Sequence, residues 1–283
     1  MNPEFLREGS AVTDFMRPDR IVVGRLDARS GDVLAELYAA FDCPKLFTTL
    51  RNAEMIKYTS NALLATLVSF SNEVAAVCEA LPGLDEATVM EGVHLDRRLA
   101  PAPGLCSYLR AGIGFGGSCL PKDVDALRAL AAAHAVPTSL LDAVVAVNRA
   151  RPDRVTALLD AALGGLAGRT VAVLGLAFKP GTDDLRDSPA LALIEALRAG
   201  GAEVRACDPL VGHADGVPLV PTPAAALAGA DAALIATAWP EFRTLDWAAL
   251  TRGMRRRLVL DGRGTLAGVT LPADVTYLRI GVG

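Results

Sequence analysis

Cysteine and histidine are scarce in this chain of 283 residues. The five cysteines are scattered, odd in number and without a Cys-x-x-Cys pair, which argues against a disulfide framework and favours a reducing cytoplasm. The three histidines are far apart, so no metal-ligand spacing is present and we expect no metal site. The cysteines are Cys43, Cys78, Cys106, Cys119 and Cys207, and the histidines are His94, His134 and His213.

A basic excess and a long apolar run are also lacking. The net charge is −4, which disfavours a nucleic-acid partner, and we expect the run Arg255 to Arg257 to be a solvated patch. The most apolar segment, residues 61–81, is interrupted by polar side chains, which predicts a buried helix and no membrane span. The N-terminus has neither the basic start nor the apolar centre of a signal peptide. These features predict a cytoplasmic protein with no membrane partner.

Hydrophobic residues make up 52% of the chain, enough for sizeable cores. A short strand is predicted at 20–24. After it, apolar residues recur at helical spacing up to residue 166. Pro152 is expected to break or kink the last of these helices. The helices are predicted at 30–41, 53–81, 85–93, 122–135 and 138–166.

From residue 169 strands alternate with helices, a pattern that predicts a doubly wound parallel sheet. The strands are expected at 170–175, 203–207, 232–236 and 258–260, and the helices at 189–199, 222–229 and 247–250. The predicted class is therefore α/β, with a mostly helical central region followed by a Rossmann-like sheet domain. The predicted domain boundaries divide the chain into residues 1–50, a central helical region at 51–166 and the Rossmann-like domain at 167–283.

A glycine-rich stretch, residues 112–118, delivers Cys119 to the start of a helix. Glycines allow a backbone to approach a ligand closely, and a helix N-terminus beside Lys122 favours a thiolate. Asp123 follows about one helical turn later. The pattern indicates a nucleophilic cysteine, but an ordinary glycine turn with Cys119 as a small core residue fits equally well.

Two further patterns have alternatives. Lys57 and Asn61 share a helix face amid apolar residues, so Lys57 either extends to solvent or belongs to a site. The segment 178–189 follows the first strand of the predicted sheet, where Lys179 and Arg186 could bind phosphate. It lacks the GxGxxG pattern, and it also fits a turn capped by Ser188, a compatible interpretation.

Together these segments resemble the UDP-glucose/GDP-mannose dehydrogenase family. Any one motif would be weak, but seven of them occur in the family's order between residue 2 and about residue 264. They are NPEFLREG, AEMIKYTSN, SFSNEVA, GFGGSCLPKD, LGLAFKPGTDDLRDSPA, IATAWPEF and LDGR.

The resemblance implies an NAD-dependent oxidation of a nucleotide-sugar C6 alcohol to a carboxylate. Cys119 is similar to the nucleophile that captures the C6 aldehyde and carries a thioester. Lys57 and Asn61 resemble the pair that stabilises charge on the C6 oxygen. Asp123 resembles a group that orients water or acts as a base, and Glu4 resembles a glutamate of thioester hydrolysis.

The resemblance also implies binding roles and a homodimer. Arg98 is similar to an arginine that reaches the neighbouring subunit's substrate. Contacts to NAD are implied for Glu8, Lys122 and Arg186. Contacts to the UDP-sugar are implied for Phe5, Leu6, Arg7, Glu8, Arg98, Arg110, Gly114, Phe115, Gly116, Phe178, Lys179 and Arg263.

The family's NAD-binding domain precedes NPEFLREG, which here follows Met1, so we expect that domain to be lacking. Three interpretations remain: a truncated dehydrogenase, a short protein that pairs with a separate NAD domain, or a nucleotide-sugar-binding or dimerisation protein without redox activity. For the substrate, PEFLREG disfavours the family's N-acetylhexosamine branch, AWPEF and LDGR favour UDP-glucose, and SCLPKD and IKYT leave GDP-mannose as the alternative.

Overall fold

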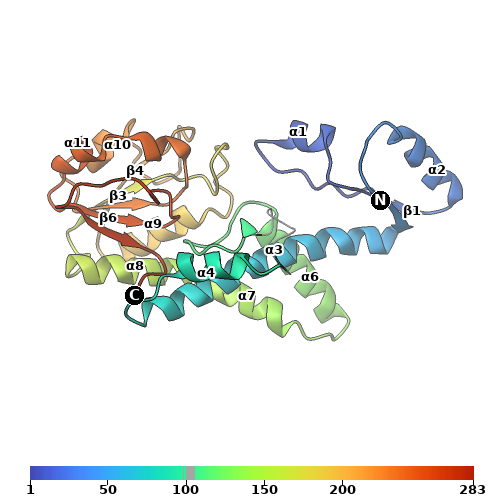
Figure 1. The fold of residues 1–283 in the computed structure, drawn as a ribbon, viewed down its shortest axis with the longest axis horizontal. Coiled ribbons are helices and arrows are strands. Elements are labelled where there is room, and N and C mark those ends of the chain that lie inside the picture. The colour runs from blue at the N-terminus through green and yellow to red at the C-terminus, as the bar shows by residue number, and fades with distance from the viewer. Residues whose placement is uncertain (98, 100–105) are drawn as a thin grey trace. The chain divides into compact units, whose positions relative to one another are not determined.

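The computed structural model describes residues 1–97, 99 and 106–283 (Figure 1). The chain forms two compact units. The first contains Met1–Leu63 and Asp123–Pro137, and the second contains Leu64–Lys122 and Thr138–Gly283. Two helices, α3 (Leu50–Glu79) and α6 (Leu120–Ala133), contribute residues to both units.

A two-stranded parallel sheet organises the first unit. Strand β1 (Ile21–Arg25) pairs with β2 (Lys45–Thr49), and the helices α1 (Ala11–Met16) and α2 (Ala28–Leu37) flank β1 in the chain. A capping box between Asp27 and Ser30 starts α2. The predicted strand at 20–24 and the helix predicted at 30–41 are confirmed, whereas α1 and β2 were not predicted from the sequence.

Helix α3 is less buried than its composition predicts. Leu63, Phe70 and Val77, spaced seven residues apart, are each about half exposed. By length and composition alone, α3 is the one helix of the described chain that could cross a membrane, although only 39% of its most apolar window is buried and core helices of soluble proteins pass the same test. The buried helix expected at 61–81 is therefore exposed along one face of α3.

The helical part of the second unit contains α4 (Glu86–His94), α7 (Ser139–Arg149) and α8 (Arg151–Leu163). The single helical stretch expected at 138–166 is broken at Ala150, and Pro152 lies in the first turn of α8, where its missing N–H costs no hydrogen bond. The predicted break at Pro152 is confirmed.

The remainder of the second unit is a five-stranded parallel sheet with the order β4-β3-β5-β6-β7. Its first strand is thus interior, the doubly wound order in which the chain turns outward in both directions from β3 and β5. The strands are β3 (Thr170–Leu174), β4 (Glu203–Cys207), β5 (Ala232–Ile235), β6 (Leu258–Asp261) and β7 (Thr276–Arg279).

Helices cover both faces of this sheet (Figure 1). Helix α8 packs on α9 (Pro189–Ala199) on one side, and α10 (Pro223–Leu227) contacts α11 (Trp247–Arg252) on the other. The central strands β3 and β5 are buried along their whole length, which explains their continuous apolar sequences. The doubly wound prediction is confirmed, although the edge strand β7 and the short 3₁₀ helix Pro240–Thr244 were not predicted.

The arginine run at 255–257 lies at the surface, as expected: Arg255 and Arg256 are exposed and Arg257 is partly exposed. Arg255 donates to Thr170 Oγ1 and forms an ion pair with Asp231, and Arg256 donates to the carbonyl oxygen of Leu163. Arg257 forms an ion pair with Asp274. The run therefore ties β6 to neighbouring segments of the second unit.

A substitution at Gly175, directly after β3, tests the close packing of this residue against Thr237. Gly175 has φ +92°, and a Cβ there would lie 2.4 Å from Thr237 Cβ. We expect Gly175→Ala to lower the free energy of unfolding by about 2 kcal/mol or more, because both the backbone strain and the overlap are unfavourable. Urea denaturation measures the change. The control Gly212→Ala, which has nothing within 4 Å of its Cβ, should have little effect, and equal effects would contradict the assignment.

Candidate functional site

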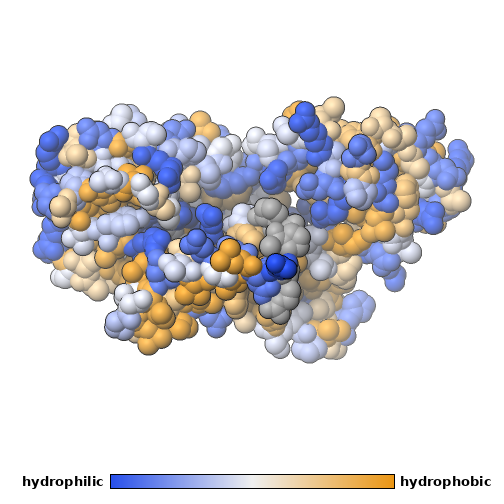
Figure 2. Space-filling view, in the orientation of Figure 1, coloured by the Kyte–Doolittle hydropathy of each residue, from blue (hydrophilic) through white to orange (hydrophobic). Residues whose placement is uncertain are grey.

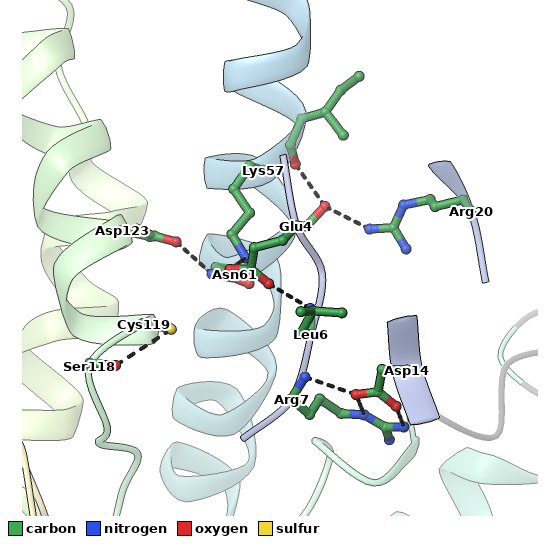
Figure 3. Close-up of polar contacts among 12 residues, drawn as sticks. Glu4, Leu6, Arg7, Asp14, Arg20, Lys57, Asn61, Ser118, Cys119 and Asp123 are labelled. Carbon is green, nitrogen blue, oxygen red and sulfur yellow. Dashed lines mark hydrogen bonds and ion pairs between the residues drawn. The ribbon is translucent and has the colours of Figure 1, made fainter. Parts of the chain in front are cut away.

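The first unit brings together four predicted catalytic side chains (Figure 3). Lys57 Nζ lies 3.2 Å from Glu4 Oε1, and Asn61 Nδ2 donates to Asp123 Oδ2 at 2.6 Å. Lys57 and Asn61 lie on one face of α3, and Asp123 lies in the first turn of α6. Only 17% of the Lys57 side chain is exposed and Asp123 is buried. Lys57 is therefore held by a partner and does not simply extend to solvent.

The segment after Glu4 is held by charge. Leu6 N donates to Glu4 Oε2 at 2.6 Å, and the guanidinium of Arg20 stacks 3.9 Å from the centre of the Phe5 ring. Arg7 donates to both carboxylate oxygens of Asp14, and this contact holds the pKa of Asp14 well below its usual range. The positive charge of Arg7 is thus already paired with Asp14.

Glu8, to which the resemblance assigns contacts with both ligands, is exposed in the turn that precedes α1. Its position at the surface leaves the carboxylate accessible to solvent.

In the second unit, side chains from three helices hold the backbone of the glycine-rich loop. Gly112 N donates to Asn72 Oδ1 at 2.8 Å, and Arg151 Nε donates to Gly112 O at 3.0 Å. Asn148 binds both polar groups of Phe115, accepting from its N–H at 2.8 Å and donating to its carbonyl at 3.0 Å. These contacts determine the path of the loop, and none of the three helical residues was singled out from the sequence.

Arg263 contacts the same loop from the end of β6. Its Nη1 donates to Gly114 O at 2.8 Å and its Nε donates to Ala236 O at 3.0 Å. Asp261 accepts from the Arg263 N–H and so orients the turn. Burial, with the nearby positive charge of Arg151, lowers the pKa of Arg263 to about 10, so it is a cation at neutral pH.

The glycine-rich loop packs directly on the loop that follows β3. A Cβ on Gly116 would lie 1.9 Å from Asp187 O, and a Cβ on Gly117 would lie 2.7 Å from the Phe178 ring. Gly117 N also donates to Arg186 O at 3.0 Å. Residues other than glycine are excluded here, because the two backbones approach too closely for a side chain.

Cys119 lies immediately before α6 and is exposed. Its Sγ lies 3.7 Å from Ser118 Oγ (Figure 3). An exposed thiol after a buried loop does not fit a small core residue, so that alternative loses its main support. Arg110, which precedes the loop, and Lys122, in the first turn of α6, are also exposed.

The remaining predicted cations lie after β3. Lys179 Nζ lies 5.5 Å from the centre of the Phe178 ring, and Arg186 forms an ion pair with Asp184 at 2.7 Å. Ser188 accepts from Ala190 N and caps α9, so the capped turn and the loop at the strand end are both present. Arg98 lies outside the described residues.

Three family models match the chain. They are the UDP-glucose/GDP-mannose dehydrogenase family's central domain at residues 51–150, its UDP binding domain at 172–268 and its NAD binding domain at 1–42. The chain belongs to the UDP-glucose/GDP-mannose dehydrogenase family. The predicted lack of an NAD-binding domain is only partly confirmed, because that domain's model matches residues 1–42.

Relatives within this dehydrogenase family are closely similar. A UDP-glucose 6-dehydrogenase of Haloferax volcanii is 46% identical over 93% of this chain and 61% of its own length, and one of Pseudomonas aeruginosa is 42% identical over 100% and 64%. The structure of a UDP-glucose dehydrogenase from Pyrobaculum islandicum is 40% identical with a TM-score of 0.87, covering 100% of this chain and 63% of that one. The chain thus spans about three fifths of the length of these family members.

Alkylation tests the exposure of Cys119 in this family member. We expect iodoacetamide to label Cys119 faster than Cys78 or Cys207, which are buried. Burial raises the pKa of the Cys207 thiol to about 11, which further slows its reaction. Peptide mass spectrometry over a time course measures each site. A Cys119→Ser variant should lose the fastest phase, and unchanged kinetics in that variant would contradict the assignment.

Proposed function

We propose that this chain carries the substrate-binding and covalent part of an NAD-dependent UDP-glucose 6-dehydrogenase. The glycine-rich loop carries the proposal, because it is held on one side by Arg263 and leads on the other to the exposed Cys119. Arg263 can attract a phosphate and Cys119 can attack a carbonyl carbon. Because one loop connects them, the pair suits a phosphorylated substrate with a reactive carbonyl. The similarity to UDP-glucose 6-dehydrogenases supports UDP-glucose as that substrate.

In the proposed reaction, Cys119 Sγ adds to the C6 aldehyde and forms a thiohemiacetal. Its oxidation yields a thioester, and hydrolysis of the C–S bond by water releases the carboxylate and the thiol. Lys57, which carries a positive charge beside Glu4, and Asn61 stabilise negative charge on the C6 oxygen. Asp123, which accepts from Asn61, orients water or takes its proton, and Glu4 assists the hydrolysis.

NAD would be the oxidant when bound: two NAD molecules would each accept one hydride, the first from C6 of the alcohol to give the aldehyde and the second from the thiohemiacetal to give the thioester. Lys122 and Arg186 are exposed cations and Glu8 is an exposed carboxylate, so each side chain is accessible for the contact with NAD that we propose for it. They do not make a dinucleotide cradle, because the turn after β3 lacks GxGxxG and runs on to α9 at Pro189.

The UDP-sugar contacts in the second unit converge at the carboxyl ends of the sheet strands. Phe178 and Lys179 follow β3, and Arg263 follows β6. Doubly wound sheets bind ligands at this edge, next to the point where the strand order reverses. We infer that residues 167–283 hold the nucleotide, that 51–166 supply catalysis and dimerisation, and that 1–50 belong to the end of the NAD-binding domain.

Calorimetric titration with UDP-glucose, GDP-mannose and NAD tests this function. We expect UDP-glucose to bind more tightly than GDP-mannose. Cys119→Ser should retain the UDP-glucose affinity within about twofold, because the thiol acts on C6 and not on the nucleotide. Binding of none of the three ligands would contradict the proposal, and loss of binding in Cys119→Ser would make Cys119 structural.

We also propose a homodimer in the cytoplasm, formed through α3. The exposed residues Leu63, Phe70 and Val77 repeat every seven positions, the spacing of a helix–helix seam. On the face seen in Figure 2, hydrophobic side chains gather over the second half of α3 and over α4. Such an apolar surface is typical of a protein interface.

A charge on that seam tests the dimer. We expect the unchanged chain to sediment as a dimer at micromolar concentration and Phe70→Glu to sediment as a monomer, because the charge would be buried without a partner. Leu210→Glu, at a similarly exposed residue outside α3 and α4, should leave the dimer intact. A monomeric unchanged chain would contradict the proposal.

A further inference from the structure

Asp208, directly after β4, is a carboxylate surrounded by N–H groups. Its Oδ2 accepts from Leu176 N at 2.7 Å, Ala177 N at 3.2 Å and Trp239 Nε1 at 3.1 Å. Its Oδ1 accepts from Leu210 N at 2.9 Å and Val211 N at 3.1 Å. Five donors from three segments therefore converge on one side chain at the carboxyl ends of β3, β4 and β5.

The same two residues after β3 are also bound through their carbonyl groups. Ser188 Oγ donates to Leu176 O and Thr237 Oγ1 donates to Ala177 O, both at 2.6 Å. All four polar backbone groups of Leu176 and Ala177 thus bind side chains from other segments. A peptide segment held in this way cannot move without breaking several hydrogen bonds that are buried or partly buried.

Phe178 and Lys179 follow this anchored segment directly. The ring of Phe178 packs on Gly117 of the glycine-rich loop, and Phe178 N donates to Asp184 O at 3.2 Å. The position of both side chains therefore depends on the two preceding residues. Asp208 is the group that binds both of their amides.

The amides of Leu176 and Ala177 lie just after the first strand of the sheet, a place where other doubly wound sheets bind phosphate. In doubly wound sheets that bind dinucleotides, the N–H groups just after the first strand bind a phosphate at the start of a helix. Here β3 is that first strand, and the amides of Leu176 and Ala177 are taken by a carboxylate of the protein itself. The helix does not begin until Pro189. A phosphate at this sheet must therefore be bound by side-chain cations.

We propose that Asp208 is a positioning residue that holds Phe178 and Lys179 for the nucleotide diphosphate, and that its carboxylate replaces a dinucleotide phosphate at the amides after β3. This inference rests on the proposed nucleotide-sugar function. Because Asp208 occupies the amides after β3, this doubly wound sheet needs no GxGxxG turn, and the diphosphate is bound by the side chains of Lys179 and Arg263.

Hydrogen exchange on the unchanged chain tests the occupied amides. We expect the amides of Leu176 and Ala177 to exchange slowly and equally with and without UDP, because Asp208 binds them in both states. New protection of these amides on addition of UDP would mean that phosphate binds there, and would overturn the proposal. Fast exchange of these amides in the unliganded chain would also overturn the proposal, and this part of the measurement stays informative if the chain does not bind UDP.

UDP calorimetry on Asp208→Asn tests the positioning role. The variant keeps the side-chain shape but turns an NH₂ group toward N–H donors, so we expect UDP affinity to fall at least about tenfold. The matched control is Asp231→Asn, because Asp231 is a buried carboxylate that accepts from Thr170 N at the opposite end of β3. It should lower the melting temperature and leave UDP affinity within about twofold.

A double-mutant cycle with Lys179→Ala separates positioning from general loss of stability. If Asp208 acts through Lys179, the effects of the two substitutions on UDP affinity will be less than additive. Fully additive effects, or an Asp208→Asn affinity equal to that of the unchanged chain, would overturn the proposal. If the unchanged chain itself does not bind UDP, the proposed function fails, and the exchange measurement decides the occupied amides separately.

Discussion

The second unit depends on close contact between two backbones, those of the glycine-rich loop and of the loop after β3. Gly116 and Gly117 lie against Asp187 O and the Phe178 ring at distances that leave no room for a Cβ. Hydrogen bonds from Asn148 and Arg263 complete the contact from the other side. This arrangement thereby determines where Arg263 lies and where the chain enters α6 after Cys119.

Side-chain carboxylates and amides hold these loops, which contain little regular secondary structure. Asp208 binds the amides after β3, Asp261 binds those of the turn that carries Arg263, and Asn72 binds Gly112. Each hydrogen bond contributes about 1 kcal/mol net, but leaving its partner buried and unpaired costs about 1–3 kcal/mol. A different path of these loops would leave such polar groups unpaired, and this energetic penalty favours the observed conformation.

Local patterns predicted most elements of the second unit. Continuous apolar runs indicated β3, β5 and β6, and Pro152 marked the break between α7 and α8. The edge strand β7 escaped because Thr276–Arg279 has no apolar run, and β2 escaped because its alternation is weak. Only the tertiary structure decided which side of α3 is covered, because an apolar composition does not reveal the covered side of a helix.

The sequence by itself determined the family motifs, the order of elements and the placement of Cys119 before a helix, because these depend on neighbouring residues. Only the tertiary structure decided that Asn72, Asn148, Arg151 and Asp208 hold the binding loops. Their partners lie 31 to 40 positions away in the chain, and no local periodicity or turn rule encodes such contacts. Hydrogen bonds between distant segments form only once the sheet and helices have brought those segments together.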